Sequence, residues 1–137
     1  MSKLLIDTNI LVYGIDQESK FFEQSRNILD HSNRQLVTTS KNLLEFLSVV
    51  TRSSGYDLPT DLALEILDDI IGGFEVIYPN QNSLALFLEL MERYQPTGLK
   101  VHDFEIISIG LAAGIHNVAT FNIKDFKAVK EIELLKL

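Results

Sequence analysis

Short runs of strand-forming residues alternate with longer stretches of helical periodicity along this 137-residue chain. The strand candidates are residues 3–6, 35–39, 74–77, 117–120 and 131–135. The helical stretches are residues 21–31, 41–52, 60–71, 82–94 and 103–114, and another helix-like stretch begins at Ile10. Alternation of this kind favours a parallel sheet covered by helices on both faces. The sequence therefore predicts an α/β protein, a three-layer α/β/α sandwich with a central parallel sheet.

Length and composition narrow the class of protein. A chain of this size corresponds to one domain that buries about two-thirds of its unfolded surface, so residues 1–137 are expected to form a single unit. The absence of cysteine excludes thiolate zinc sites and cysteine nucleophiles and fits a reducing compartment. The chain starts without signal-peptide features, and its least polar stretch, residues 106–115, is too short to span a membrane. We therefore expect a cytoplasmic protein with no membrane contact.

Acidic side chains stand where predicted strands give way to helices. Asp7 directly follows the first strand, Glu45 lies in the helix after the second, and Asp103 lies in the first turn of its helix. Asn122 and Asp125 follow the fourth strand. In open α/β sheets, ligands collect at the carboxyl ends of the strands, so these groups are expected to meet at one edge. Such a cluster repels itself unless a cation neutralises it, which indicates a metal-dependent enzyme.

Each of these residues also has an ordinary structural explanation. Asp103 heads an apolar stripe at positions 106, 107, 110, 111 and 114 and so points inward, but an acid in a first turn also favours the helix dipole. Asp7, with Thr8 and Asn9 after it, is a common helix start. Asn122 is also a typical turn residue, and Asp125 can cap the turn at residues 124–127.

The helix that carries Glu45 is predicted to pack through Leu43, Leu44, Leu47 and Val50. Its other side groups Glu45 with Lys41, Asn42, Ser48 and Arg52. This side is either a solvated face with a weak ion pair, or a metal ligand flanked by cations that contact phosphates. The net charge of −7 disfavours nucleic-acid binding by bulk electrostatics, so RNA contacts would be local. The candidates for them are Lys41, Arg52, Lys100 and Lys124.

Several other chemistries find no support. The chain has no glycine-rich phosphate loop, no nucleophile elbow and no dinucleotide fingerprint. A phosphatase with an aspartate nucleophile would also begin with Asp7, but it needs a second aspartate two residues later, where Asn9 stands. The three histidines lack ligand spacing and are interpreted as surface or capping residues.

With these residues assembled, the chain resembles the PIN-domain nucleases, and most closely the VapC-type ribonuclease toxins of bacterial toxin–antitoxin pairs. The stretches that carry the resemblance are residues 4–13, 42–46, 102–103 and 119–126. The resemblance implies a PIN-like fold over residues 1–137 and metal-dependent cleavage of RNA phosphodiester bonds. It also implies a small antitoxin protein as a partner and a homodimer.

The resemblance also assigns roles to individual residues. Asp7, Glu45 and Asp103 match the three core metal-binding acids of the family, and Thr8 or Asn9 matches a polar position that supports the first acid. The fourth acidic position corresponds to Asn122, or to Asp125 in the closing Asp-Phe pair. Asn122 can accept a hydrogen bond or orient a water, but it adds no negative charge. Oxygen donors of this kind suit one or two Mg²⁺ or Mn²⁺ ions.

These observations lead to the hypothesis of a metal-dependent endoribonuclease, the toxin of a type II toxin–antitoxin pair. One alternative is a non-catalytic PIN-like module that binds RNA or protein and uses its acids structurally. Another is a metal-dependent phosphatase, which Asn9 disfavours.

Overall fold

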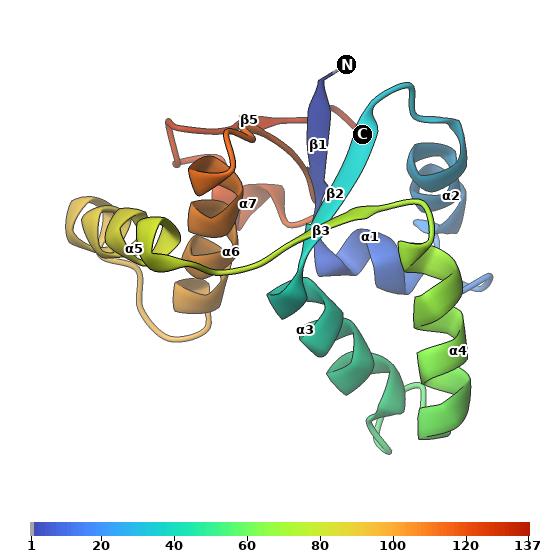
Figure 1. Cartoon of the computed structure of the whole chain (residues 1–137). Helices are drawn as coiled ribbons and strands as arrows, with labels where there is room; N and C mark the ends of the chain where they lie inside the picture. Colours follow the sequence, from blue (N-terminus) through green and yellow to red (C-terminus); the bar gives the residue numbers. More distant parts are fainter. Residues whose placement is uncertain (1) are drawn as a thin grey trace.

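Five strands form one sheet in the computed structural model, which describes residues 2–137 (Figure 1). The strands are β1 (Lys3–Ile6), β2 (Gln35–Thr39), β3 (Glu75–Ile77), β4 (Asn117–Ala119) and β5 (Glu133–Leu134). They lie in the order β3-β2-β1-β4-β5, and every neighbouring pair is parallel. The central strand is β1, where Leu5 pairs with Val37 of β2 on one side and with Val118 of β4 on the other. The carboxyl ends of all five strands therefore lie at one edge.

The strands agree closely with the prediction. The bounds of β1 and β2 match it, β3 and β4 are each one residue shorter, and β5 is reduced to two residues. β5 pairs with β4 alone and lies at the edge of the sheet, where short strands are common.

Seven helices connect these strands among the described residues. They are α1 (Thr8–Tyr13), α2 (Phe22–His31), α3 (Ser40–Thr51), α4 (Thr60–Ile71), α5 (Gln81–Tyr94), α6 (Lys100–Ala112) and α7 (Ile123–Phe126). α6 begins three residues before the predicted start, after Gly98 turns the chain with a φ of 62°. It ends at Ala112 because Gly114 adopts a left-handed φ of 77°, a common way to stop a helix. Each of the seven is too short or too polar to cross a lipid bilayer.

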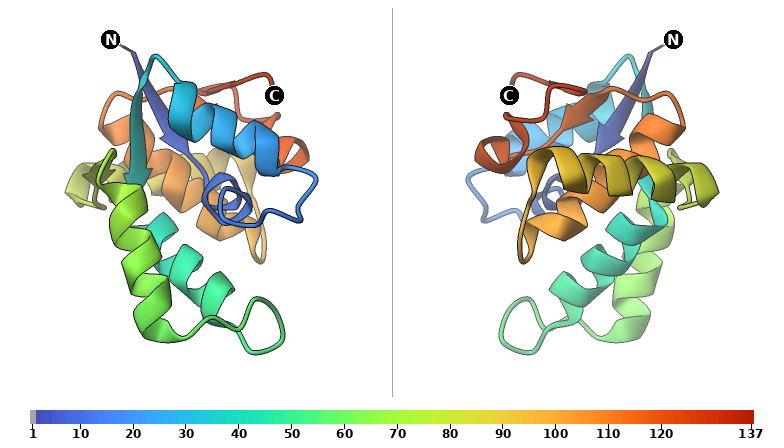
Figure 2. Two further views of the ribbon diagram at one scale, coloured as in Figure 1. Left: turned by 90° about the vertical axis from the view of Figure 1, so that its right-hand side faces the viewer. Right: turned by 90° about the vertical axis from the view of Figure 1, so that its left-hand side faces the viewer.

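The two faces of the sheet bury separate apolar clusters. Leu4 and Ile6 of β1 point toward α1, α2, α3 and α4, whereas Leu5 between them points toward α5, α6 and α7. This alternation is the strand period of two, and it produces the three layers visible in Figure 2. The fold is a three-layer α/β/α sandwich with a central parallel sheet, as the alternation of elements predicted.

Gly110 brings α6 close to the central strand. A Cβ atom at this position would lie 3.0 Å from Cδ2 of Leu5, so a larger residue would force the Leu5 side chain or the helix to shift by a few tenths of an ångström. The close approach matters for the candidate site because the first turn of α6 carries Asp103, and Asp7 directly follows β1.

Candidate functional site

Asp7 is the buried acid at the end of the central strand. Its backbone N–H donates to the Ala119 carbonyl at 3.0 Å, and it is the N-cap of α1. The side chain is only 6% exposed. Its Oδ1 accepts from the backbone N–H of Thr8 at 2.9 Å, and its Oδ2 accepts from the Thr120 hydroxyl at 2.7 Å. The carboxylate is therefore fixed from both sides.

A shell of polar side chains sets the direction of these hydrogen bonds. The Thr120 hydroxyl accepts from Asn9 Nδ2 at 3.2 Å and from the backbone N–H of Asn122 at 3.0 Å. The Thr120 O–H therefore donates its own hydrogen bond to Asp7. On the other side, Asn42 Nδ2 donates to Thr8 Oγ1 at 3.0 Å and more distantly, at 3.4 Å, to Asp7 Oδ1. The surrounding groups thus present Asp7 with donors only.

Burial nevertheless raises the pKa of Asp7 above its ordinary value, and the negative charge of Glu45 adds to this effect. The hydrogen bonds from Thr120, Thr8 and Asn42 oppose it, because they stabilise the ionised form. An ionised Asp7 in this position lacks a compensating positive charge. A cation at the open side of the carboxylate would supply one.

Asp103 lies half-buried in the first turn of α6 and shares this environment. Burial, together with the charges of Asp7, Glu45 and Asp125, raises the pKa of Asp103 to about 7, although the charge of Lys100 opposes this shift. Carboxylates at the end of β1, on α3 and on α7 are therefore near enough to Asp103 to disfavour its ionised form. That these acids form one site stays a prediction.

The outer members of this acid cluster differ in their contacts. Glu45 is exposed on α3, one helix turn beyond Lys41. Asp125 accepts from Asn122 Nδ2 at 2.7 Å and lies 3.7 Å from Lys100 Nζ. Asn122 thus directs its amide nitrogen toward Asp125, so the carboxylate of Asp125 is the group at this end of the cluster that carries negative charge.

The donor set suits a hard divalent cation. Asp7, Glu45, Asp103 and Asp125 offer carboxylate oxygens, which Mg²⁺ and Mn²⁺ prefer, and their mutual repulsion is the kind that such an ion relieves. Within residues 2–137, however, no three His, Cys, Asp or Glu side chains converge closely enough to form a complete metal cage. The exposed Glu45 would have to turn inward to join the buried acids.

Two residues that support Asp7 are absent from the predicted site. Asn42 was placed on the exposed side of α3, but it is fully buried, while Leu44, predicted to pack, is 63% exposed. Phe46 fills the core instead. Asn42 turns inward because it closes a capping box with Thr39, a pattern readable as Thr39-x-x-Asn42. Thr120 offered no comparable signal, since its role depends on a partner 113 residues away.

The four cations suggested for RNA contacts occupy different places. Lys100 and Lys124 line one cavity of about 240 Å³ that also contains Asp125. Lys41 lies at the start of α3, 3.8 Å from Glu105. Arg52 caps the far end of α3, seven residues beyond Glu45 and therefore about 10 Å further along the helix axis. The structure brings the three lysines near the acids and leaves Arg52 away from them.

Without metal, the free energy of unfolding should decrease as the pH rises from about 5 to about 8. The folded-state pKa of Asp103 is about 7 against an ordinary 3.8, so the folded protein holds this proton more tightly. The stabilisation that this proton provides is complete below the ordinary pKa of 3.8 and is lost as the pH rises through about 7. Urea denaturation in EDTA across this range should show the decrease, and Asp103→Asn should flatten it. Asp68→Asn, on the exposed side of α4, is the control. A slope in Asp103→Asn as steep as in wild type would contradict the assignment.

Known proteins that resemble this chain identify its family. A family model described as the PIN domain matches residues 4–132. No curated protein matches the chain at a significant level. Among solved structures, VapBC2 from Rickettsia felis, bound to a DNA fragment from its promoter, is similar with a TM-score of 0.75 and 23% identity, over 98% of both chains.

Two other solved structures are similar over nearly their whole length. FitAcB from Neisseria gonorrhoeae has a TM-score of 0.75 and 16% identity, over 97% of this chain and 96% of that one. The sarcin–ricin loop cleaving toxin VapC20 from Mycobacterium tuberculosis has a TM-score of 0.73 and 12% identity, over 92% and 95%. At these identities the likeness establishes the fold.

Proposed function

The chain belongs to the PIN-domain family, and from this premise we propose that it is a metal-dependent endoribonuclease that hydrolyses RNA phosphodiester bonds. The observation that carries the proposal is the acid cluster of Asp7, Glu45, Asp103 and Asp125, in which burial and the three neighbouring negative charges raise the pKa of Asp103. A structural role would not require four carboxylates from four separate elements to approach one another. Residues 1–137 would form one nuclease unit.

In this proposal, Asp7, Glu45 and Asp103 hold Mg²⁺ or Mn²⁺, and Asp125 completes the site. When bound, such an ion polarises the scissile phosphate and activates water for attack. Thr8 and Thr120 keep the Asp7 carboxylate from rotating, since each donates to a different oxygen. Asp103 gives up its proton when positive charge arrives, because the repulsion that raised its pKa is then relieved.

Lysines around the acids would hold the RNA backbone. Lys100 and Lys124, in the cavity beside Asp125, are placed to contact phosphates on one side of the scissile bond. Lys41 would contact them on the other side. Each such contact supplies positive charge that the chain as a whole lacks, at a net charge of −7.

The biological setting is also part of the proposal. The similar VapBC and FitA–FitB structures contain toxin–antitoxin proteins, which supports a role as the toxin of a type II pair. A small antitoxin protein and a second copy of the chain are the partners that this role implies.

Metal titration with a direct cleavage assay tests the proposed function. At Mn²⁺ about 100-fold above its Kd, the protein should gain about 2.7 kcal/mol, which corresponds to a rise in Tm of roughly 10 °C. The same concentration should start cleavage of a labelled single-stranded RNA. A chromogenic phosphomonoester serves as the comparison substrate and should remain intact.

Two other outcomes of this experiment would each support one of the alternative functions. Hydrolysis of the phosphomonoester with intact RNA would identify a phosphatase. RNA binding with neither cleavage nor stabilisation by Mn²⁺ would identify a non-catalytic module.

A further inference from the structure

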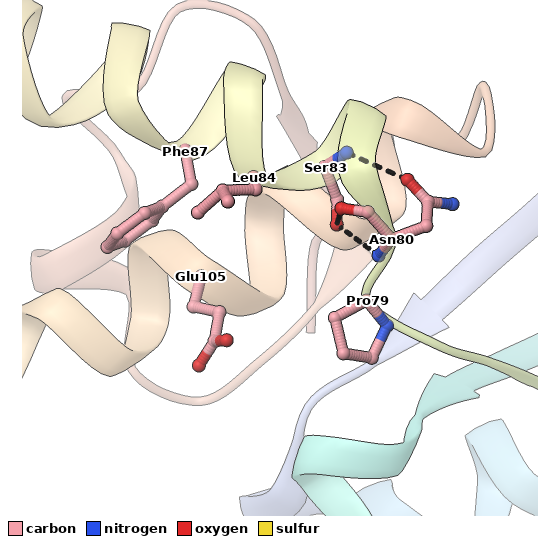
Figure 3. A pocket seen from close by; sticks show the side chains of 6 residues that line it. All are labelled: Pro79, Asn80, Ser83, Leu84, Phe87 and Glu105. Carbon is pink, nitrogen blue, oxygen red and sulfur yellow. Dashed lines mark hydrogen bonds between the residues drawn. The ribbon is translucent and has the colours of Figure 1, made fainter.

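A second cavity lies between the beginning of α5 and the middle of α6. It has a volume of about 280 Å³ and is lined by Pro79, Asn80, Ser83, Leu84, Phe87 and Glu105 (Figure 3). This volume is near the lower end of the range for small-molecule sites, roughly 300–1,000 Å³, so the cavity suits one planar ring system. Its walls are mainly apolar, from the Pro79 ring, the Leu84 side chain and the Phe87 ring.

The polar groups of the α5 wall are already occupied. Asn80 and Ser83 form a capping box, in which Asn80 Oδ1 accepts from the Ser83 N–H at 2.9 Å and Ser83 Oγ accepts from the Asn80 N–H at 2.8 Å. The Ser83 hydroxyl in turn donates to the Asn80 carbonyl at 2.9 Å. This wall is therefore rigid and offers a ligand mainly apolar surface.

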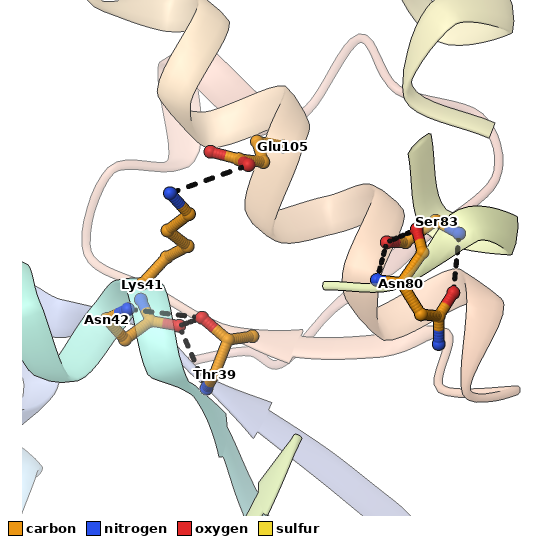
Figure 4. A network of polar contacts seen from close by, with 6 residues as sticks. All are labelled: Thr39, Lys41, Asn42, Asn80, Ser83 and Glu105. Carbon is orange, nitrogen blue, oxygen red and sulfur yellow. Dashed lines mark hydrogen bonds and ion pairs between the residues drawn. The ribbon is translucent and has the colours of Figure 1, made fainter. Parts of the chain in front are cut away.

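Glu105 is the charged group of the cavity and remains available. Its carboxylate lies opposite Lys41, with Oε2 at 3.8 Å from Lys41 Nζ, which is too long for a hydrogen bond (Figure 4). This long ion pair is the polar contact that the carboxylate makes within residues 2–137. Its side chain is 33% exposed, so it is accessible from the cavity but partly shielded from bulk water. Both oxygens can still accept.

Lys41 links the cavity to the acid cluster. It lies 3.8 Å from Glu105 and precedes Glu45 by one turn of α3. Glu105 itself follows Asp103 by two residues and therefore points to another side of α6. Lys41 therefore stands between the acids and the cavity. An RNA strand whose scissile phosphate lies at the acids could place its next phosphate at Lys41 and the attached base in the cavity.

We propose that this cavity binds an unpaired guanine base adjacent to the cleaved phosphate and that Glu105 is the residue that selects it; this inference rests on the proposed function. Guanine is the RNA base that presents two neighbouring donors, N1–H and the 2-amino group, on its Watson–Crick edge. A carboxylate accepts both at once, whereas adenine and cytosine place an acceptor beside their amino group. Unpaired bases in RNA are commonly read on this edge while their faces rest on apolar or aromatic side chains.

A protein partner is the competing occupant. Leu84, which lines the cavity, is 57% exposed, and Leu88 on α5 and Tyr78 before it are 59% and 65% exposed. Covering the cavity with an apolar protein surface would bury the Glu105 carboxylate with only the long ion pair to Lys41, which is costly. A base with two donors satisfies the carboxylate, so the observations favour RNA.

The test replaces one guanine next to a mapped cleavage site by inosine, which lacks the 2-amino group alone. Wild-type protein should cleave the inosine substrate about tenfold to a hundredfold less efficiently in kcat/KM, the range for loss of a bidentate base contact. Glu105→Gln should cleave both substrates equally. Glu89→Gln, the same chemical change on the exposed side of α5, should retain the wild-type preference.

Binding of the same oligonucleotides in EDTA, followed by fluorescence anisotropy, separates this inference from the proposed function. Guanine-dependent binding that Glu105→Gln abolishes, without cleavage by the wild type, would reject the nuclease and keep the base site. Cleavage and binding that both ignore inosine and Glu105→Gln would overturn the base site. So would a change in oligomeric mass on Leu84→Ser with unaltered RNA binding, since the cavity would then be a protein contact.

Discussion

Asp103→Asn should lower the rate of metal-dependent RNA cleavage by at least about a thousandfold while leaving the protein folded. A metal ion contributes several kcal/mol to transition-state stabilisation, and each 1.36 kcal/mol corresponds to a factor of about ten in rate. The substitution removes a charge from the acid cluster and keeps the shape of the side chain. Single-turnover cleavage of a labelled RNA at saturating Mn²⁺ measures the loss, with Asp68→Asn as the matched control.

The same substitution at Asp7 should have a similar effect on cleavage but a different effect on stability. Asp103→Asn relieves repulsion, so the metal-free protein should become more stable. Asp7→Asn would place an amide NH₂ where a carboxylate oxygen accepts the proton of Thr120, whose hydroxyl already accepts two other hydrogen bonds. A buried donor would be left without an acceptor, at a cost of about 1–3 kcal/mol. Full Mn²⁺-dependent activity in both variants would reject the assignment of the site.

Phe46→Ala should reduce the free energy of unfolding by about 3–5 kcal/mol, the usual cost of deleting a buried aromatic ring. Phe46 is completely buried in the cluster beneath α3, and a domain typically has only about 5–15 kcal/mol of stability to lose. Urea denaturation measures the change.

Leu44→Ala is the control on the same helix. Its side chain is 63% exposed, so the loss should stay within about 0.5 kcal/mol. Equal losses in the two variants would mean that the packed face of α3 is not the one containing Phe46.

Much of the fold could be predicted because its signals are local. The strand-forming runs of β1 and β2 and the acid in the first turn of α6 can each be recognised within a few residues. The approach of Asp7, Glu45 and Asp103 could also be predicted, since a parallel sheet gathers the carboxyl ends of its strands at one edge. The observed parallel sheet confirms the fold on which this prediction rests.

The remaining features depend on contacts between distant segments. Three features require two or more elements to be in place. They are the inward orientation of Asn42, the hydrogen bond that Thr120 donates to Asp7, and the cavity between α5 and α6. Helical periodicity also assigned Leu44 to the packed side of α3, because apolar residues surround Glu45 on several sides. Periodicity reports where apolar residues recur, and it does not identify which of them meet a neighbouring helix.

The order of the strands has a consequence for the timing of synthesis. Among the five strands, β1 is synthesised first and becomes the middle of the sheet. Its neighbour β4 and Thr120, which donates a hydrogen bond to Asp7, are synthesised more than 100 residues later. Until the segment near residue 120 has been synthesised, β1 can therefore pair on one side only, and Asp7 lacks the hydrogen bond from Thr120. This strand order imposes a delay between the start of translation and a complete site.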